Sequence, residues 1–254
     1  MTQRKPLIAG NWKMNKTCAE AMDTARTLVS LVSDVKDVEV MITPPFTALA
    51  QVADIIASTP VELGAQDVFW EDHGAYTGQV SAPMLVSAGC TYVIIGHSER
   101  RQYFNETDQT VNKKVKAAFA GGLAPVVCVG ETEADRDAQK TFSVLDKQMD
   151  NGLEGLTVEI MANAVIAYEP VWAIGTGKTA TPLQVQEVHA FLRSFLKQRF
   201  GDGIAGQIRI LYGGSVKPGN AAELMALADV DGALVGGASL DAEIFSKIVH
   251  FGKA

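Results

Sequence analysis

Short apolar runs recur along the whole chain, and this repeat constrains the fold more than any other feature. Each run is rich in β-branched residues and apolar at consecutive positions instead of alternating. A strand has this pattern when other elements cover both of its faces, as in parallel sheets. The eight runs cover residues 7–11, 38–43, 61–66, 92–97, 124–129, 164–169, 208–213 and 231–236.

Helical stretches lie between the runs. Residues 17–20 form a capping box, and residues 181–184 form another with a proline at the first helical position. In residues 182–200, apolar side chains recur at spacings of three and four, with polar side chains between them. The pattern predicts amphipathic helices that each pack one face on a sheet.

Strand and helix alternate to the end of the chain without a linker, which predicts one α/β domain over residues 1–254. A chain of 254 residues that is 47% hydrophobic can bury a full core. Two architectures fit: an open doubly wound sheet, or a closed (β/α)8 barrel of parallel strands ringed by helices. The turn after 7–11 lacks a glycine-rich dinucleotide fingerprint, which favours the barrel.

Polar residues gather just past the ends of the runs. In an open sheet the first and eighth strands would lie about 34 Å apart, at about 4.8 Å per strand. Closure makes those strands neighbours, so that the residues at their ends can share a small ligand at the C-terminal face. The residues are Asn11, Lys13, His97, Ser98, Glu99, Glu169, Gly213, Gly214, Ser215, Gly236 and Gly237.

Charge and cysteine content exclude several classes. The net charge of −7 disfavours nucleic-acid binding and requires that any anionic ligand be held by local amides and positioned cations. The three cysteines, Cys18, Cys90 and Cys128, are far apart and show no metal-ligand spacing. No apolar run reaches the length of a signal segment or a membrane span. We therefore expect a soluble cytoplasmic protein with reduced thiols and no metal.

Four motifs together resemble the triosephosphate isomerase family: AGNWKMN at 9–15, GHSERR at 96–101, AYEPVWAIGTG at 167–177 and YGGSV at 212–216. The resemblance covers the whole chain, and four motifs in order are far more specific than one. It implies a TIM barrel that interconverts dihydroxyacetone phosphate and D-glyceraldehyde 3-phosphate in glycolysis and gluconeogenesis. It also implies a homodimer and a reaction without a cofactor.

The resemblance assigns catalysis to Glu169, His97 and Lys13. From the residues alone, Glu169 is equally a general base or a carboxylate paired with a lysine, and a lone histidine at a strand end is more often structural. The amides of Ser98 and Glu99 open a helical turn and would disfavour a positive charge on His97. By resemblance, His97 polarises the substrate carbonyl as a neutral ring, and Glu99 pairs with Lys13.

The glycine pairs at 213–214 and 236–237 follow the last two strands, where barrels often bind phosphate through backbone amides. Most such pairs merely turn the chain, so the resemblance decides in favour of a phosphate site. The predicted substrate-binding residues are Asn11, Lys13, Gly175, Ser215, Gly236 and Gly237.

Residues 171–180 form a long connection with an apolar tip. The nucleotide phosphate loop is excluded, because Trp172 stands where that motif needs a glycine. An ordinary surface loop remains the alternative, although it would leave large side chains exposed. The resemblance implies a lid that closes over the substrate phosphate. The lid residues are Val171, Trp172, Ala173, Ile174, Gly175, Thr176, Gly177, Lys178 and Thr179.

A second long connection, residues 67–78, carries the aromatic residues Phe69, Trp70 and Tyr76, which indicates either a partner surface or a loop folded back on its own barrel. The resemblance implies that it docks into a second subunit through Thr77. Gln79 departs from the family, in which a glutamate pairs across the interface with the arginine matching Arg100.

Two other functions stay open at this stage: a barrel acting on a different sugar phosphate, and a catalytically idle phosphate-binding scaffold. The first lacks the four motifs. The second has no need of a carboxylate, an imidazole and an ammonium together. Cys128 is interpreted as a core residue, and His73, His189 and His250 have no ligand pattern.

Overall fold

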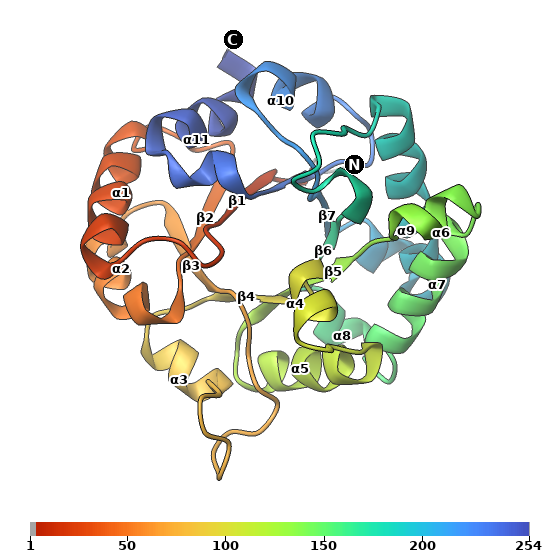
Figure 1. Cartoon of the computed structure of the whole chain (residues 1–254), viewed down its shortest axis with the longest axis horizontal. Coiled ribbons are helices and arrows are strands. Elements are labelled where there is room, and N and C mark those ends of the chain that lie inside the picture. The colour runs from red at the N-terminus through yellow and green to blue at the C-terminus, as the bar shows by residue number, and fades with distance from the viewer. Residues whose placement is uncertain (1–3, 254) are drawn as a thin grey trace.

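The strands of the molecule close into a barrel in chain order, each parallel to its neighbours, and β1 pairs with β8 (Figure 1). This computed structural model describes residues 4–253, so residues 1–3 and 254 of the predicted domain lie outside it. The closed barrel is confirmed over the open sheet. The strands are β1 Leu7–Asn11, β2 Glu39–Thr43, β3 Val61–Ala65, β4 Tyr92–Ile95, β5 Ala124–Val129, β6 Val165–Tyr168, β7 Arg209–Tyr212 and β8 Gly232–Val235.

Helices ring the barrel on the outside (Figure 1). Within residues 4–253 they are α1 Cys18–Leu31, α2 Leu49–Ile56, α3 Ala82–Ser87, α4 Ser98–Tyr103, α5 Asp108–Ala120, α6 Glu133–Asp137, α7 Thr141–Gly152, α8 Val158–Met161, α9 Pro182–Ala205, α10 Pro218–Met225 and α11 Ala242–Val249. Short 3₁₀ helices span Phe46–Ala48, Val171–Ala173, Gly237–Leu240 and Phe251–Lys253. None of the helices in this range has the length and apolarity needed to cross a bilayer.

Two buried apolar layers explain why the strands read as continuous apolar runs. Alternate strand residues such as Leu7, Ala9 and Val165 form a cluster inside the barrel. The residues between them, such as Ile8 and Ile166, belong to a larger cluster shared with the helices. Since both faces of each strand are covered, polar positions are excluded from both.

Both predicted capping boxes are present. Thr17 accepts a hydrogen bond from the amide of Glu20, and Thr181 accepts one from the amide of Gln184. Helix α9 continues to Ala205, beyond the predicted end at residue 200. The extension follows a kink at Gly201, whose φ of 85° is a left-handed value that joins two helical segments.

Strands β4, β6, β7 and β8, which precede polar residues of the mouth, are shorter than the predicted runs. β4 ends at Ile95 and β6 ends at Tyr168, so His97 and Glu169 lie just outside the ladder. Gly96, with a φ of 75°, ends the alternation of β4. Without that turn the side chain of His97 would face the helices, as those of Val93 and Ile95 do.

Candidate active site

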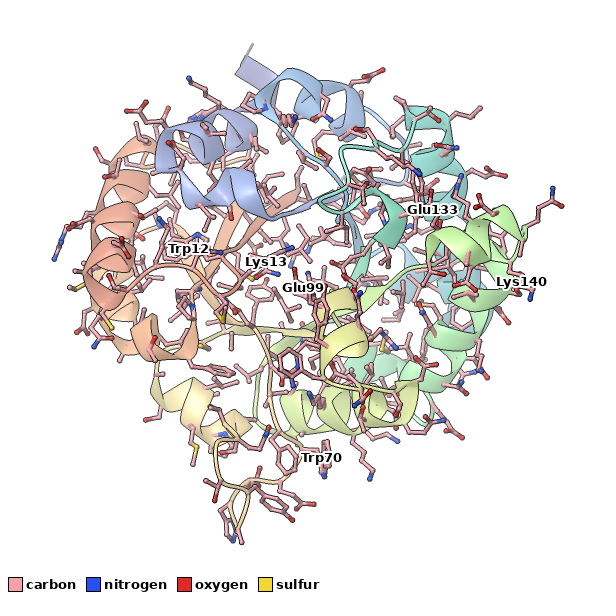
Figure 2. The ribbon with its side chains drawn as sticks, viewed as in Figure 1. Trp12, Lys13, Trp70, Glu99, Glu133 and Lys140 are labelled. Carbon is pink, nitrogen blue, oxygen red and sulfur yellow. The ribbon has the colours of Figure 1, made fainter. Side chains whose placement is uncertain are left out.

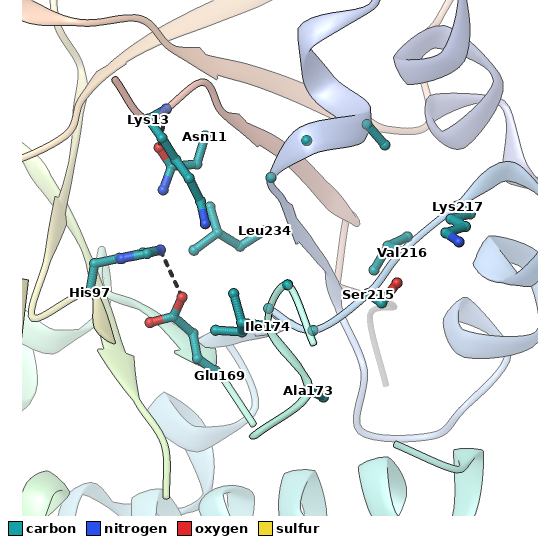
Figure 3. Close-up of a pocket in the computed structure, with 16 residues that line it drawn as sticks. Asn11, Lys13, His97, Glu169, Ala173, Ile174, Ser215, Val216, Lys217 and Leu234 are labelled. Carbon is teal, nitrogen blue, oxygen red and sulfur yellow. Dashed lines mark hydrogen bonds and ion pairs between the residues drawn. The ribbon is translucent and has the colours of Figure 1, made fainter. Parts of the chain in front are cut away.

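A cavity of about 300 Å³ opens at the C-terminal mouth of the barrel. Lys13, His97 and Glu169 all point into it (Figure 3). They follow β1, β4 and β6, which closure brings around one space. The cavity is lined by Asn11, Lys13, His97, Glu169, Ala173, Ile174, Gly175, Gly213, Gly214, Ser215, Val216, Lys217, Leu234, Gly236, Gly237 and Ala238.

Glu169 continues the inward register of Val165 and Ala167 and is only 2% exposed. Its Oε1 lies 2.9 Å from Nε2 of His97, and its Oε2 accepts a hydrogen bond of 2.9 Å from the amide of Ser98. Gly213 makes room for it, since a Cβ there would lie 2.8 Å from Cγ of Glu169. Both carboxylate oxygens are therefore fixed, although the carboxylate borders open space.

His97 is the N-cap residue of α4. Its Nδ1 accepts a hydrogen bond of 3.2 Å from the amide of Glu99. Only an unprotonated nitrogen can accept, so this contact assigns the ring proton to Nε2, which donates to Glu169. The Nε2–H group of His97 and the carboxylate of Glu169 therefore form a donor–acceptor pair, and the cavity lies beside this pair.

The pKa values of this pair move apart. Burial raises the pKa of Glu169, but His97, the Ser98 amide and Lys13 more than offset it, so that the pKa is lowered overall. Burial lowers the pKa of His97, but the Glu169 carboxylate outweighs burial and the pKa is raised. The prediction from sequence considered only the helix amides, which oppose a positive charge on His97 and of which the Glu99 amide does contact Nδ1. The Glu169 carboxylate, which that prediction did not consider, acts in the opposite direction.

Lys13 contributes a cation held by Glu99: its Nζ lies 2.8 Å from Glu99 Oε1 at the centre of the barrel mouth (Figure 2). Its backbone amide donates to Oδ1 of Asn11 over 3.0 Å. That contact uses the oxygen of Asn11 and leaves its Nδ2 group to donate toward the cavity. Ser98 and Glu99 thus lie beside two catalytic candidates, Glu169 and Lys13. The family resemblance implied the second of these contacts.

Backbone amides from the segments after β7 and β8 also line the cavity and are here called the amide wall. The N–H groups of Gly214, Ser215 and Gly237 donate no hydrogen bond within residues 4–253. Unpaired amides of this kind are donors for an anion. Elsewhere in the described part of the chain, no three His, Cys, Asp or Glu side chains gather in a way that could hold a metal ion.

The known proteins that resemble this chain decide its family. The family model described as triosephosphate isomerase matches residues 6–252. The chain belongs to the triosephosphate isomerase family. The triosephosphate isomerase of Endomicrobium trichonymphae is 55% identical over 98% of this chain and all of its own length. That of Geobacter metallireducens is 57% identical over 98% of this chain and 99% of its own. The crystal structure of the Bartonella henselae isomerase superposes with a TM-score of 0.90 at 45% identity, covering 98% and 100% of the two chains.

Residues 171–179, the predicted lid of this triosephosphate isomerase family member, differ from the prediction in one detail. Their apolar residues do not form the tip. Val171–Ala173 is a 3₁₀ helix at the base of the loop, and residues 175–179 form the exposed tip. Trp172 is half-buried because its Nε1 donates to Oε1 of Glu131 over 2.9 Å and Arg136 stacks on its ring. At the tip, Lys178 pairs with Glu133.

The connection after β3 projects from the barrel (Figure 1). The ring centroid of Phe69 lies 4.1 Å from that of Trp70 and 4.7 Å from that of Tyr76. Residues 71–79, including Thr77 and Gln79, are exposed. Arg100 pairs with Asp67 of the same chain, 3.0 Å away. The aromatic residues therefore stack on one another, and the rest of the connection extends into solvent.

Reasoning from the sequence missed two polar residues of the site. Glu131 is fully buried and accepts hydrogen bonds from Tyr168, Trp172 and Arg136 at the base of the predicted lid. Gln66 donates to the carbonyl of Lys13. Each follows a strand closely, β5 and β3 respectively, so the rule that singled out Glu169 would have found them. Leu234, Val216 and Lys217 complete the cavity wall without any such signal.

Proposed function

We propose that Glu169, His97 and Lys13 interconvert dihydroxyacetone phosphate and D-glyceraldehyde 3-phosphate through an enediolate. The observation that carries this proposal is the convergence of a carboxylate, an imidazole N–H and an ammonium on one cavity whose amide wall offers unpaired donors. Membership of the triosephosphate isomerase family supports the reaction. The idle scaffold needs none of the three groups and has no observation in its favour.

Glu169 acts as the general base. Its lowered pKa keeps it ionised, and it takes the proton from the carbon next to the substrate carbonyl. The electron pair of that C–H bond moves to form the enediolate, whose oxygen accepts hydrogen bonds from His97 Nε2 and Lys13. His97 then moves a proton between the two enediolate oxygens. Glu169 returns its proton to the neighbouring carbon, so nothing else is consumed.

Substrate must first separate the pair. Without substrate, the Nε2 proton of His97 is donated to Glu169 over 2.9 Å. The substrate carbonyl replaces Glu169 as the acceptor, which frees the carboxylate for the C–H proton. The new hydrogen bond strengthens as negative charge develops on the oxygen, so it favours the transition state over the ground state.

The phosphate is held on the amide wall. Asn11, Lys13, Gly175, Ser215, Gly236 and Gly237 are the proposed substrate-binding residues, and all of them line the cavity. About three charge-assisted amide hydrogen bonds, at roughly 1.5 to 3 kcal/mol each, give micromolar to millimolar binding before ordering costs. Local donors of this strength offset the net charge of −7.

Residues 171–179 serve as the lid. Ile174 and Gly175 already border the cavity, so a small movement of the tip brings amides and apolar atoms over the phosphate. Closure excludes water, and the enediolate is then reprotonated instead of losing phosphate. Ser98 and Glu99 support the site by holding Glu169 and Lys13.

We also propose a cytoplasmic homodimer. Apolar side chains are exposed on the connections after the first four strands, which are neighbours in the barrel. Met14 is 95% exposed, Phe46 40%, Tyr76 44% and Tyr103 66%. A partner subunit that receives the loop with Phe69, Trp70, Tyr76 and Thr77 would bury such a surface. Sedimentation tests this, and a mass equal to one chain at all concentrations would contradict it.

The decisive experiment is an assay on purified protein treated with a chelator. Dihydroxyacetone phosphate is supplied, and glyceraldehyde 3-phosphate is followed through a coupled dehydrogenase. We expect turnover that needs no added metal or cofactor. Absence of product would favour the scaffold.

A further inference from the structure

Lys13 has an unusual backbone conformation. Its φ is 52°, a left-handed value that a residue with a side chain adopts only when its surroundings hold it there. The conformation directs Nζ into the cavity (Figure 3). Nζ also pairs with Glu99 over 2.8 Å. The amide of Lys13 is tied to Asn11, and its carbonyl needs a partner as well.

Gln66 supplies that partner. It is the first residue after β3, and its Nε2 donates to the carbonyl of Lys13 over 2.8 Å and to the carbonyl of Thr43 over 2.9 Å. Thr43 is the last residue of β2. One side-chain amide group therefore joins the C-terminal ends of three neighbouring strands, and both of its protons are used.

The structure assigns Gln66 as a positioning residue for Lys13. Gln66 does not line the cavity, so its effect on substrate must pass through another residue. By holding the carbonyl of Lys13, it keeps the backbone left-handed and the ammonium within reach of the enediolate. The inference rests on the proposed isomerase activity, in which Lys13 stabilises negative charge.

A double-mutant cycle tests this role. Gln66→Met keeps the size of the side chain and removes both donors. We expect it to lower kcat/KM by about 10- to 100-fold, the scale on which misplacement of a catalytic group acts. In a Lys13→Met background the same change should cost less than about two-fold, because the group that Gln66 positions is already absent. Circular dichroism establishes that each variant is folded.

Gln148 provides a matched control. It is also a half-buried glutamine that holds a loop at the barrel mouth, with a contact of 2.8 Å to the amide of Gly130 and one of 3.1 Å to its carbonyl. Gln148→Met removes the same number of hydrogen bonds, and neither of them involves Lys13 or its bonded partners Asn11 and Glu99. Any loss it causes should be equal in the native and Lys13→Met backgrounds.

Two results would overturn the assignment: a native kcat/KM in Gln66→Met, or an equal loss of kcat/KM in both backgrounds. If Gln66→Met does not fold, Gln66→Glu replaces it, since it keeps the shape of the side chain and removes the donors. If neither variant folds, Gln66 is a stability residue and the assignment is wrong. An inactive native protein would instead refute the proposed function itself.

Discussion

The two ends of the barrel both carry charged side chains in its interior, and they differ in what those side chains contact. At the N-terminal end, Arg209 NH1 lies 2.8 Å from Glu39 and its NH2 lies 2.8 Å from the hydroxyl of Tyr92, which in turn donates to Glu39. At the mouth, His97 faces Glu169 and Lys13 faces Glu99.

The presence of a cavity does not by itself distinguish the functional end of the barrel from the other end. Tyr92 and Arg209 also border a cavity, of about 250 Å³. Burial raises the pKa of Tyr92 to about 12, so the hydroxyl stays protonated and the three groups satisfy one another. The mouth adds an acid–base pair and unpaired amides. At the mouth, polar groups that can exchange their partners lie beside amides that donate no hydrogen bond, and this combination indicates a binding site. At the N-terminal end, the polar groups contact only one another, which indicates a role in stability.

The largest expected effect follows from removing the carboxylate at the mouth. Glu169→Gln should lower kcat by at least about 10²- to 10⁴-fold, because the amide cannot take a proton from carbon. Steady-state assays in both directions measure this. Glu39→Gln removes a carboxylate at the other end and should leave kcat near native. Near-native turnover in Glu169→Gln would remove the proposed base.

Removing a charged side chain at the N-terminal end of the barrel should lower the free energy of unfolding and leave kcat unchanged. Arg209→Met deprives Glu39 and Tyr92 of a charged partner and should lower the free energy of unfolding by about 1–3 kcal/mol. Urea denaturation gives that number. At temperatures where the variant is folded, kcat should change by less than about two-fold. A large loss of kcat with native stability would break the distinction between the two ends.

The sequence predicts the barrel well because its signals are local. A strand that is buried on both faces has apolar residues at consecutive positions, which the sequence shows directly. β1, for example, matches its predicted run of 7–11. Capping at Thr17 and Thr181 is equally local. The kink at Gly201 is less predictable, since a single glycine inside a helical pattern is compatible with either a continuation or an end.

Apart from the Lys13–Glu99 pair, which the family resemblance implied, contacts between distant segments are what the sequence did not reveal. Gln66 and Lys13 are 53 positions apart, and Trp172 meets Glu131 across 41. Strand-end placement suggests that such residues face the mouth, but only the closed barrel shows which of them touch. The pKa of His97 is the same kind of problem, since its direction depends on a carboxylate 72 residues away along the chain.

The pair at the mouth should also give a pH signature in stability. The pKa of Glu169 is lowered from 4.5, so its stabilising effect is present above pH 4.5 and lost as the pH falls through the lowered value. The pKa of His97 is raised from 6.5, so its effect is present below pH 6.5 and lost as the pH rises through the raised value.

The difference in unfolding free energy between native protein and Glu169→Gln should therefore be largest between pH 4.5 and 6.5 and decline on both sides. His189 is an internal control. Burial lowers its pKa to about 4, so it destabilises both proteins equally on acidification and cancels in the difference. A difference that stays flat from about pH 4 to 9 would show that the pair does not couple.

The smallest effect concerns a cation on the rim. Lys217 is exposed, lines the cavity and makes no ion pair within residues 4–253. A chain of net charge −7 repels a phosphorylated substrate at long range, and a rim ammonium offsets this locally. Lys217→Gln should raise KM by about two- to five-fold at low ionic strength, with kcat unchanged, and the effect should vanish near about 0.5 M salt.

Lys36→Gln is the matched control, because that lysine is also exposed but precedes β2 at the far end of the barrel. It removes the same charge and should leave KM unchanged at every salt concentration. If both variants raise KM equally, the net charge of the protein alone governs substrate binding, and the position of Lys217 at the rim does not matter. If the effect of Lys217→Gln persists at high salt, the ammonium contacts the phosphate directly, and Lys217 then belongs with the amide wall as a binding residue.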